Sequence, residues 1–155
     1  MLVELLDPDA MLLHYTAQDA EDVVRRLSQM LFEKGYVRSS FADAALRREA
    51  ELPTGLVLGG AVNAAIPHTD VEHVIRPAVA LATLTKPVIF RHMIDPTEEV
   101  PVQIVFLLAL EQPKSQVAML QEVAGVLQNA AIIERIMEAE TSEEIFALFD
   151  HDVLN

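Results

Sequence analysis

The sequence contains no cysteine, and its 11 lysines and arginines are outnumbered by 24 aspartates and glutamates. The lack of cysteine excludes disulfide bonds, thiolate nucleophiles and cysteine-ligated metal sites, and it fits a cytoplasmic protein. The formal net charge of −13 argues against a nucleic-acid partner and against anionic membrane surfaces. It favours a cationic protein partner, although acidity that only keeps a protein soluble explains the charge equally well.

Long hydrophobic runs are also missing. The strongest run, from Ile104 to Leu110, has seven residues, whereas a spanning helix needs about 18 or more. The segment from Met1 to Asp7 lacks the basic region of a secretory signal. We therefore expect no membrane insertion. With 155 residues, 52% of them hydrophobic, the chain is long enough for a single domain over 1–155 with a substantial core.

Hydrophobic spacing indicates an α/β domain. Short apolar runs bounded by turn residues predict strands over 1–6, 12–16, 61–67, 78–84 (extended or paired by 88–90) and 102–110. Three- and four-residue spacing predicts helices over 19–34, 39–51, 114–127 and 129–139, and a last helix that begins at 141. Strands interleaved with helices are typical of one sheet with helices packed against it.

The stretch 61–70 is the strongest candidate for a functional site. Its apolar part ends at Pro67, which cannot donate to a sheet, so the strand should finish there. His68 then lies at the carboxyl end of a strand, where open α/β sheets bind ligands. Thr69 and Glu72 fit a capping box, and a helical turn there would direct free backbone N–H groups toward an anion beside the histidine. Judged on these residues alone, His68 is more often a satisfied boundary histidine than a reactive one.

The segment 63–70 resembles the phosphohistidine motif of the fructose/mannitol superfamily of enzyme IIA proteins, which belong to the sugar phosphotransferase system. Similarity continues through 53–56, 73–77 and 87–90, covers nearly the whole chain, and is closest to the galactitol-type branch. The resemblance implies a single mixed β-sheet flanked by helices on both faces, the mannitol/fructose-type enzyme IIA fold.

The resemblance also implies a phosphoryl carrier. His68 would accept a phosphoryl group from the phosphohistidine of the carrier protein HPr and pass it to a cysteine of a cognate IIB protein. That protein would serve the membrane component IIC during uptake of a sugar or polyol resembling galactitol. No cofactor, metal or nucleotide is needed at this step. A regulatory module resembling nitrogen-type IIA proteins, whose phosphorylation state controls partners, is the alternative, and an interaction domain with an inert His68 is a third possibility.

The chemistry of imidazole suits such a carrier, because the ring is largely neutral and nucleophilic near neutral pH. A hydrogen bond from one ring nitrogen to a backbone carbonyl would fix both the tautomer and the direction of the ring. The resemblance implies that Nε2 of His68 takes the phosphoryl group. The residues alone do not choose between the two nitrogens.

Four further residues are candidates for supporting the transfer. Arg48 falls where the family keeps an active-site arginine, whose planar guanidinium can hold two phosphoryl oxygens. Without the resemblance, a solvated cation at a helix end is the better explanation of Arg48, and Arg47 is the neighbour with which it is most easily confused. Thr54 and Asn63 would flank the crevice, together with Thr69. A turn hydroxyl and a hydrogen-bonded strand-edge amide explain Thr54 and Asn63 equally well.

Mannitol- and fructose-type relatives carry a second active-site histidine where this chain has Gln116. Glutamine can donate a hydrogen bond but carries no charge, so transfer cannot depend on a second imidazolium there. We expect Gln116 to line the site, and this difference favours the galactitol type. Metal binding is not expected, because His68 and His73 are five residues apart, unlike the i, i+4 pair of a zinc helix.

Overall fold

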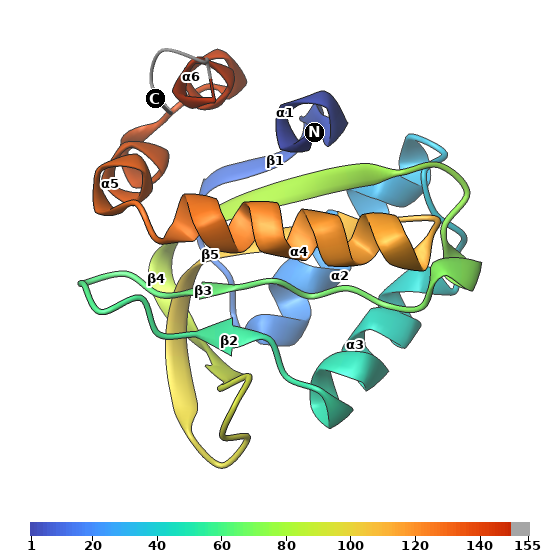
Figure 1. Ribbon diagram of the computed structural model, residues 1–155, viewed down its shortest axis with the longest axis horizontal. Coiled ribbons are helices and arrows are strands. Elements are labelled where there is room, and N and C mark those ends of the chain that lie inside the picture. Colours follow the sequence, from blue (N-terminus) through green and yellow to red (C-terminus); the bar gives the residue numbers. More distant parts are fainter. Residues whose placement is uncertain (150–155) are drawn as a thin grey trace.

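The computed structural model describes residues 1–149 and is built around one mixed five-stranded sheet with the strand order β1-β4-β5-β3-β2 (Figure 1). The strands are β1 (Leu6–Tyr15), β2 (Gly55–Leu56), β3 (Ala64–Ala65), β4 (Ala78–Arg91) and β5 (Glu99–Ala109). β1 runs parallel to β4 and β3 runs parallel to β5, whereas the β4–β5 and β2–β3 pairs are antiparallel. The predicted α/β fold with a single mixed sheet is confirmed.

Helices cover both faces of this sheet (Figure 1). The helices are α1 (Leu2–Leu5), α2 (Ala20–Glu33), α3 (Phe41–Glu51), α4 (Pro113–Leu127), α5 (Ala130–Glu138) and α6 (Ser142–Leu148), with a 3-10 turn, η1 (Val71–His73). Successive strand residues point to opposite faces, so Ala80 packs with α2 and α3 while Leu81 packs with the other helices. Burial on both faces explains why β4 and β5 read as nearly continuous apolar runs.

The predicted strand over 1–6 is wrong. Residues Leu2–Leu5 form one helical turn, and the first strand runs from Leu6 to Tyr15, so it also takes in all but the last residue of the predicted short strand 12–16. Leu2 and Leu6 are both buried in the core that α4 covers, and because i and i+4 share a face in a strand as well as in a helix, the apolar spacing alone did not distinguish the two. The carboxylate of Glu122 on α4 accepts a hydrogen bond from the Leu2 N–H at 2.6 Å, which satisfies a free donor of this turn.

The region around 61–70 agrees with the sequence in part. β3 is shorter than predicted, but its alignment beside β5 continues, since the Leu108 N–H donates to the Pro67 carbonyl at 3.0 Å. The chain therefore leaves the sheet at Pro67 as predicted. The capping box is wrong: the turn after it is the three-residue η1, its N-cap is Asp70, and no side chain caps it. Thr69 is buried instead of exposed at a helix start.

Other predicted elements hold with small shifts. The segments 78–84 and 88–90 form one strand, β4, with a register irregularity opposite β5 between Thr83 and Val88. Within residues 1–149, no helix has both the length and the apolar character needed to cross a bilayer.

Candidate active site at His68

His68 lies just beyond the carboxyl end of β3 and is buried, with 8% of its surface exposed. Its Nδ1 is 2.9 Å from the carbonyl oxygen of Ile66. A carbonyl can only accept, so Nδ1 carries the proton and donates, and neutral His68 presents an unprotonated Nε2. This bond fixes the tautomer and the direction of the ring, as expected for a phosphoryl-carrying histidine.

The surroundings of His68 favour the neutral ring. Burial lowers the pKa of His68, and the nearby Arg48 guanidinium acts in the same direction. The hydrogen bond to Ile66 and the charge of Asp70 oppose this shift of the pKa without cancelling it. Near neutral pH the imidazole is therefore an uncharged nucleophile.

A pocket of about 200 Å³ opens beside His68. It lies between the end of α3, the turn that follows it and the loop between β4 and β5, and is lined by Arg48, Glu51, Leu52, Pro53, Thr54, His68, Met93 and Pro96. The pocket thus combines a neutral imidazole with a guanidinium, two groups that are far apart in the sequence.

Arg48 contributes its charge to this pocket. One terminal nitrogen, Nη1, donates to Oδ1 of Asp70 at 3.1 Å. The Nε of the same guanidinium is buried and has no hydrogen-bond partner among residues 1–149. Arg47, the neighbour most easily confused with it, is exposed and does not line the pocket. A buried donor without a partner, next to a nucleophilic nitrogen, suits an anionic ligand.

Thr54, which lines the pocket, links α3 to the segment before His68. Its hydroxyl and its backbone N–H both donate to the carboxylate of Glu49, each at 2.7 Å. The same hydroxyl accepts the Ile66 N–H at 3.1 Å. Thr54 therefore lines the pocket, yet its hydroxyl is already engaged on both sides.

Glu49 is the residue of this site that the sequence analysis missed. Burial raises the pKa of Glu49 to about 7, although its two hydrogen bonds with Thr54 act in the opposite direction. A signal was present in the sequence, because Phe41, Ala45 and Glu49 follow one another at four-residue spacing. The first two are buried on the inner side of α3, so an acidic residue next on this stripe marks a carboxylate facing inward.

The remaining candidates lie at different distances from the pocket. Gln116, in the first turn of α4, donates from Nε2 to the Thr69 carbonyl at 2.8 Å, which ties α4 to the residue after His68. Neither Gln116 nor Thr69 lines the 200 Å³ pocket. Asn63 lies before β3, where its side-chain amide donates to the Pro101 carbonyl and accepts from Leu58.

Asn63 does not line the His68 pocket. Its amide holds the loop between β2 and β3 in place, which is the strand-edge role that the sequence left open. The two ends of β3 thus serve different purposes, because Asn63 precedes the strand and His68 follows it.

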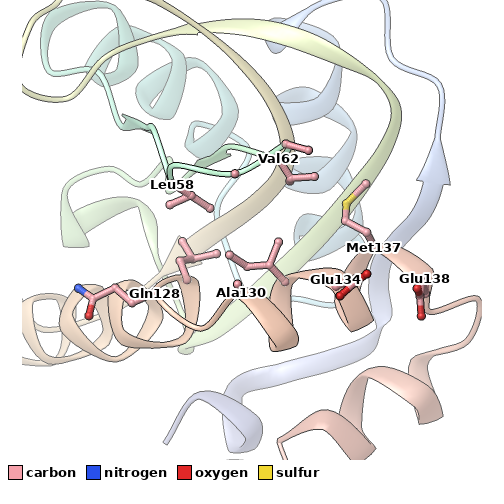
Figure 2. Close-up of a pocket in the computed structure, with 11 residues that line it drawn as sticks. Leu58, Val62, Gln128, Ala130, Glu134, Met137 and Glu138 are labelled. Atoms are coloured by element: carbon pink, nitrogen blue, oxygen red, sulfur yellow. The ribbon is translucent and has the colours of Figure 1, made fainter.

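A larger pocket, of about 450 Å³, lies between the β2–β3 loop and the junction of α4 with α5 (Figure 2). Its walls are largely apolar, with Leu58 and Val62 from the β2–β3 loop and Met137 from α5, while Glu134 and Glu138 also come from α5 (Figure 2). No lining residue is basic or nucleophilic, so this pocket is not suited to a phosphoryl group. Within residues 1–149, no cluster of three or more His, Asp or Glu side chains could hold a metal ion.

Comparison with known proteins gives a consistent result. Residues 4–152 match the family model described as phosphoenolpyruvate-dependent sugar phosphotransferase system, EIIA 2. The chain is 32% identical over 119 residues to the galactitol-specific EIIA component of the PTS of Escherichia coli K12. The aligned residues cover 77% of this chain and 78% of that protein.

Two solved structures share the fold. The crystal structure of IIA mannitol from Escherichia coli has a TM-score of 0.75 at 22% identity and covers 96% of this chain and 98% of its own. A complex of enzyme IIA and phosphorylated enzyme IIB of the mannitol system of Escherichia coli has a TM-score of 0.74 at 23% identity and covers 93% of this chain and 97% of the matched one.

Proposed function

Because the chain belongs to the EIIA 2 family of the phosphoenolpyruvate-dependent sugar phosphotransferase system, we propose that it carries a phosphoryl group on Nε2 of His68. The phosphoryl group comes from the phosphohistidine of HPr and goes to a cysteine of a cognate IIB protein. Membership of the family makes the chain a phosphotransferase component. The donor, the acceptor and the residue that carries the group are our proposal.

The observation that carries the proposal is the pairing of His68 with Arg48 in one pocket. In the accepting step, Nε2 attacks phosphorus while the bond from phosphorus to the HPr histidine breaks, and the electron pair of that bond returns to the HPr ring. The proton on Nδ1 stays in its bond to the Ile66 carbonyl. In the delivering step, a thiolate of IIB attacks phosphorus and Nε2 leaves with its electron pair.

Arg48 supports both steps by stabilising the charge on the phosphoryl oxygens. Its buried Nε–H has no partner among the described residues, and its Nη1 pairs with the exposed Asp70. Exposed ion pairs contribute little, so a phosphoryl oxygen can take over the guanidinium from Asp70 at small cost. Donors that are already in position when charge builds up in the transition state accelerate transfer most.

The surface around the pocket fits a protein partner better than a small donor. Leu52, Met93 and Ile94 expose 57%, 40% and 85% of their surfaces, and the first two also line the pocket. Exposed apolar side chains grouped beside a reactive residue are typical of protein-docking surfaces. The net charge of −13 favours a basic partner, since opposite charge speeds encounter.

The remaining parts of the proposal follow from the similarity to the galactitol-specific component. We propose that the step takes place in the cytoplasm and serves uptake of a galactitol-like polyol through IIB and the membrane component IIC. Gln116 supports the site by holding the backbone after His68 through its bond to Thr69. A regulatory role is the alternative, in which phosphorylation controls other proteins instead of transport.

Phosphoryl transfer with purified components tests the proposal. Phosphoenolpyruvate, enzyme I and HPr should place an acid-labile phosphate on the wild-type chain and on His73→Ala, but none on His68→Ala. Labelled wild-type protein should then lose its phosphate to a galactitol-type IIB. Label retained on His68→Ala would refute the choice of histidine, and label that never leaves for IIB would favour the regulatory alternative.

A further inference from the structure

A continuous series of hydrogen bonds joins Glu49 to the imidazole of His68. The carboxylate of Glu49 accepts from the Thr54 N–H and hydroxyl, both at 2.7 Å. The hydroxyl of Thr54 accepts from the Ile66 N–H at 3.1 Å, and the carbonyl of Ile66 accepts from Nδ1 of His68 at 2.9 Å. The carboxylate of Glu49 is therefore linked to the His68 ring through two residues, Thr54 and Ile66.

The direction of these bonds is determined by the groups in them. The backbone N–H of Ile66 can only donate, so the Thr54 hydroxyl must accept from it and send its own hydrogen elsewhere. That hydrogen goes to Glu49, which also receives the Thr54 N–H. Accepting both bonds suits the ionised form of Glu49, because an ionised carboxylate has two oxygens that only accept.

The burial of the intermediate groups makes this link sensitive to a change at Glu49. Thr54 and Ile66 are 3% and 1% exposed, so water cannot replace a lost partner easily. Glu49 also lies next to Arg48 on α3, so the same carboxylate joins the helix that carries the guanidinium to the peptide that orients the imidazole. A buried donor left without an acceptor favours movement of the turn that holds it.

We infer that Glu49 is a positioning residue for phosphoryl transfer, which acts on His68 through Thr54 and the Ile66 peptide. This inference rests on the proposed role of His68 as phosphoryl carrier. Glu49 does not line the His68 pocket and touches no reacting atom, so its effect is on the direction of the ring and the turn beneath it.

The protonation of Glu49 gives this role a recognisable pH dependence. Burial raises the pKa of Glu49 to about 7, and the only hydrogen-bonding groups that shift it are the two from Thr54. Arg48 and Glu51 lie near Glu49 on α3, His68 lines the pocket with Arg48, and Asp70 pairs with Arg48, but none of these groups is among those that shift the pKa of Glu49. As pH falls through about 7, the carboxyl gains a hydrogen, and the oxygen that carries it becomes a poorer acceptor for one of the two bonds from Thr54.

Protonation of Glu49 should lower the rate of phosphoryl transfer. The transfer rate should be highest above about pH 7 and should fall as Glu49 becomes protonated. Protonation of His68 adds a second loss of rate at lower pH, because burial lowers the pKa of that ring below its usual value. Removing the titrating group at Glu49 should abolish the first loss and leave the second.

The test measures transfer from phospho-HPr at several pH values between about 5.5 and 8.5. Glu49→Gln should lower the maximal rate about tenfold at about pH 8. It should leave the KM for phospho-HPr unchanged and remove the step in the profile near pH 7. Asp43→Asn, which takes an exposed carboxylate from the same helix, should behave like wild type.

Variants of Thr54 give an independent reading if Glu49→Gln does not fold. Thr54→Val keeps the shape but removes the hydroxyl and should slow transfer as Glu49→Gln does, whereas Thr54→Ser should restore it. The nitrogen-15 shifts of the His68 ring should move in Thr54→Val and stay in Thr54→Ser. Equal rates and ring shifts for these two variants would overturn the inference.

Failure of this inference is distinguishable from failure of the proposed function. If wild type takes no phosphate on His68, the carrier function itself is wrong. If wild type is labelled on His68 and Glu49→Gln keeps its rate and the step near pH 7, the carrier stands and only the role of Glu49 is refuted.

Discussion

Replacing Glu49 by glutamine is expected to change how the stability of this protein depends on pH. A carboxyl with an ordinary pKa of 4.5 has its pKa raised to about 7 in the folded chain, chiefly by burial. The folded state therefore holds a proton on Glu49 over a range of pH in which the unfolded state has released it. Stability from this group is fully present below about pH 4.5 and is lost as pH rises through about 7.

The size of the effect follows from the two pKa values. The difference between 4.5 and about 7 corresponds to roughly 3 kcal/mol in the free energy of unfolding. Glutamine does not titrate, so the difference between wild type and Glu49→Gln isolates this contribution from all other carboxylates. Wild type should lose about 3 kcal/mol relative to the variant between about pH 4.5 and pH 8.

Urea unfolding followed by circular dichroism, at half-unit steps of pH, measures this difference. The dependence of the free energy of unfolding on urea concentration, the m-value, should be the same for both proteins, so that a change in the midpoint reports a change in stability. Asp43→Asn gives the effect of removing an exposed carboxylate from the same helix. A difference between wild type and Glu49→Gln that is flat with pH would refute the raised pKa. A difference that changes in the opposite direction would mean that the bonds from Thr54 outweigh burial.

Three further predictions concern the site and its support. Arg48→Lys should slow phosphoryl transfer about tenfold or more in the labelling assay, because a point charge replaces a planar fork, whereas Arg47→Lys should be silent; the reverse would move the site to Arg47. Gln116→Ala should slow transfer about tenfold by releasing the Thr69 carbonyl. Gln116→His should add a dependence on pH between about 6 and 8; a harmless alanine together with an unchanged pH profile would place Gln116 outside the site. Gly55→Ala should destabilise the protein by about 1–3 kcal/mol in urea unfolding, since a Cβ there would lie 2.5 Å from a β4 carbonyl oxygen, and an unchanged midpoint would show that the strands can separate to admit it.

Local patterns in the sequence predicted much of the fold. The apolar stripes of α2 and α4 and the unbroken runs of β4 and β5 require only that one or both faces be buried, so periodicity and run length predict them. β3 ends at Ala65, and its alignment beside β5 continues only as far as Pro67, which lacks the N–H that the sheet would use. The position of His68 at that strand end was therefore predictable from the chain itself.

Tertiary structure decided whatever depends on a distant partner. Residues Leu2–Leu5 became a helical turn because Leu2 packs beneath α4 and Glu122 binds its N–H. The Asn63 amide is engaged in the β2–β3 loop, because Pro101 and Leu58 supply the groups that it bonds. Arg48 shares the pocket with His68 whereas Arg47 is exposed, a difference that two adjacent arginines in the sequence do not reveal.

For Glu49, the sequence predicts the side of the helix but not the hydrogen-bond partner. Its four-residue spacing from Phe41 and Ala45 was readable in the sequence and indicates a carboxylate on the inner side of α3. What it binds there was not readable, because Thr54 meets it only after the chain turns out of the helix. Hydrophobic burial requires a repeating pattern of apolar residues, which can be recognised in a short stretch of sequence. A hydrogen bond requires one donor and one acceptor at a particular distance, and only the folded chain sets that distance.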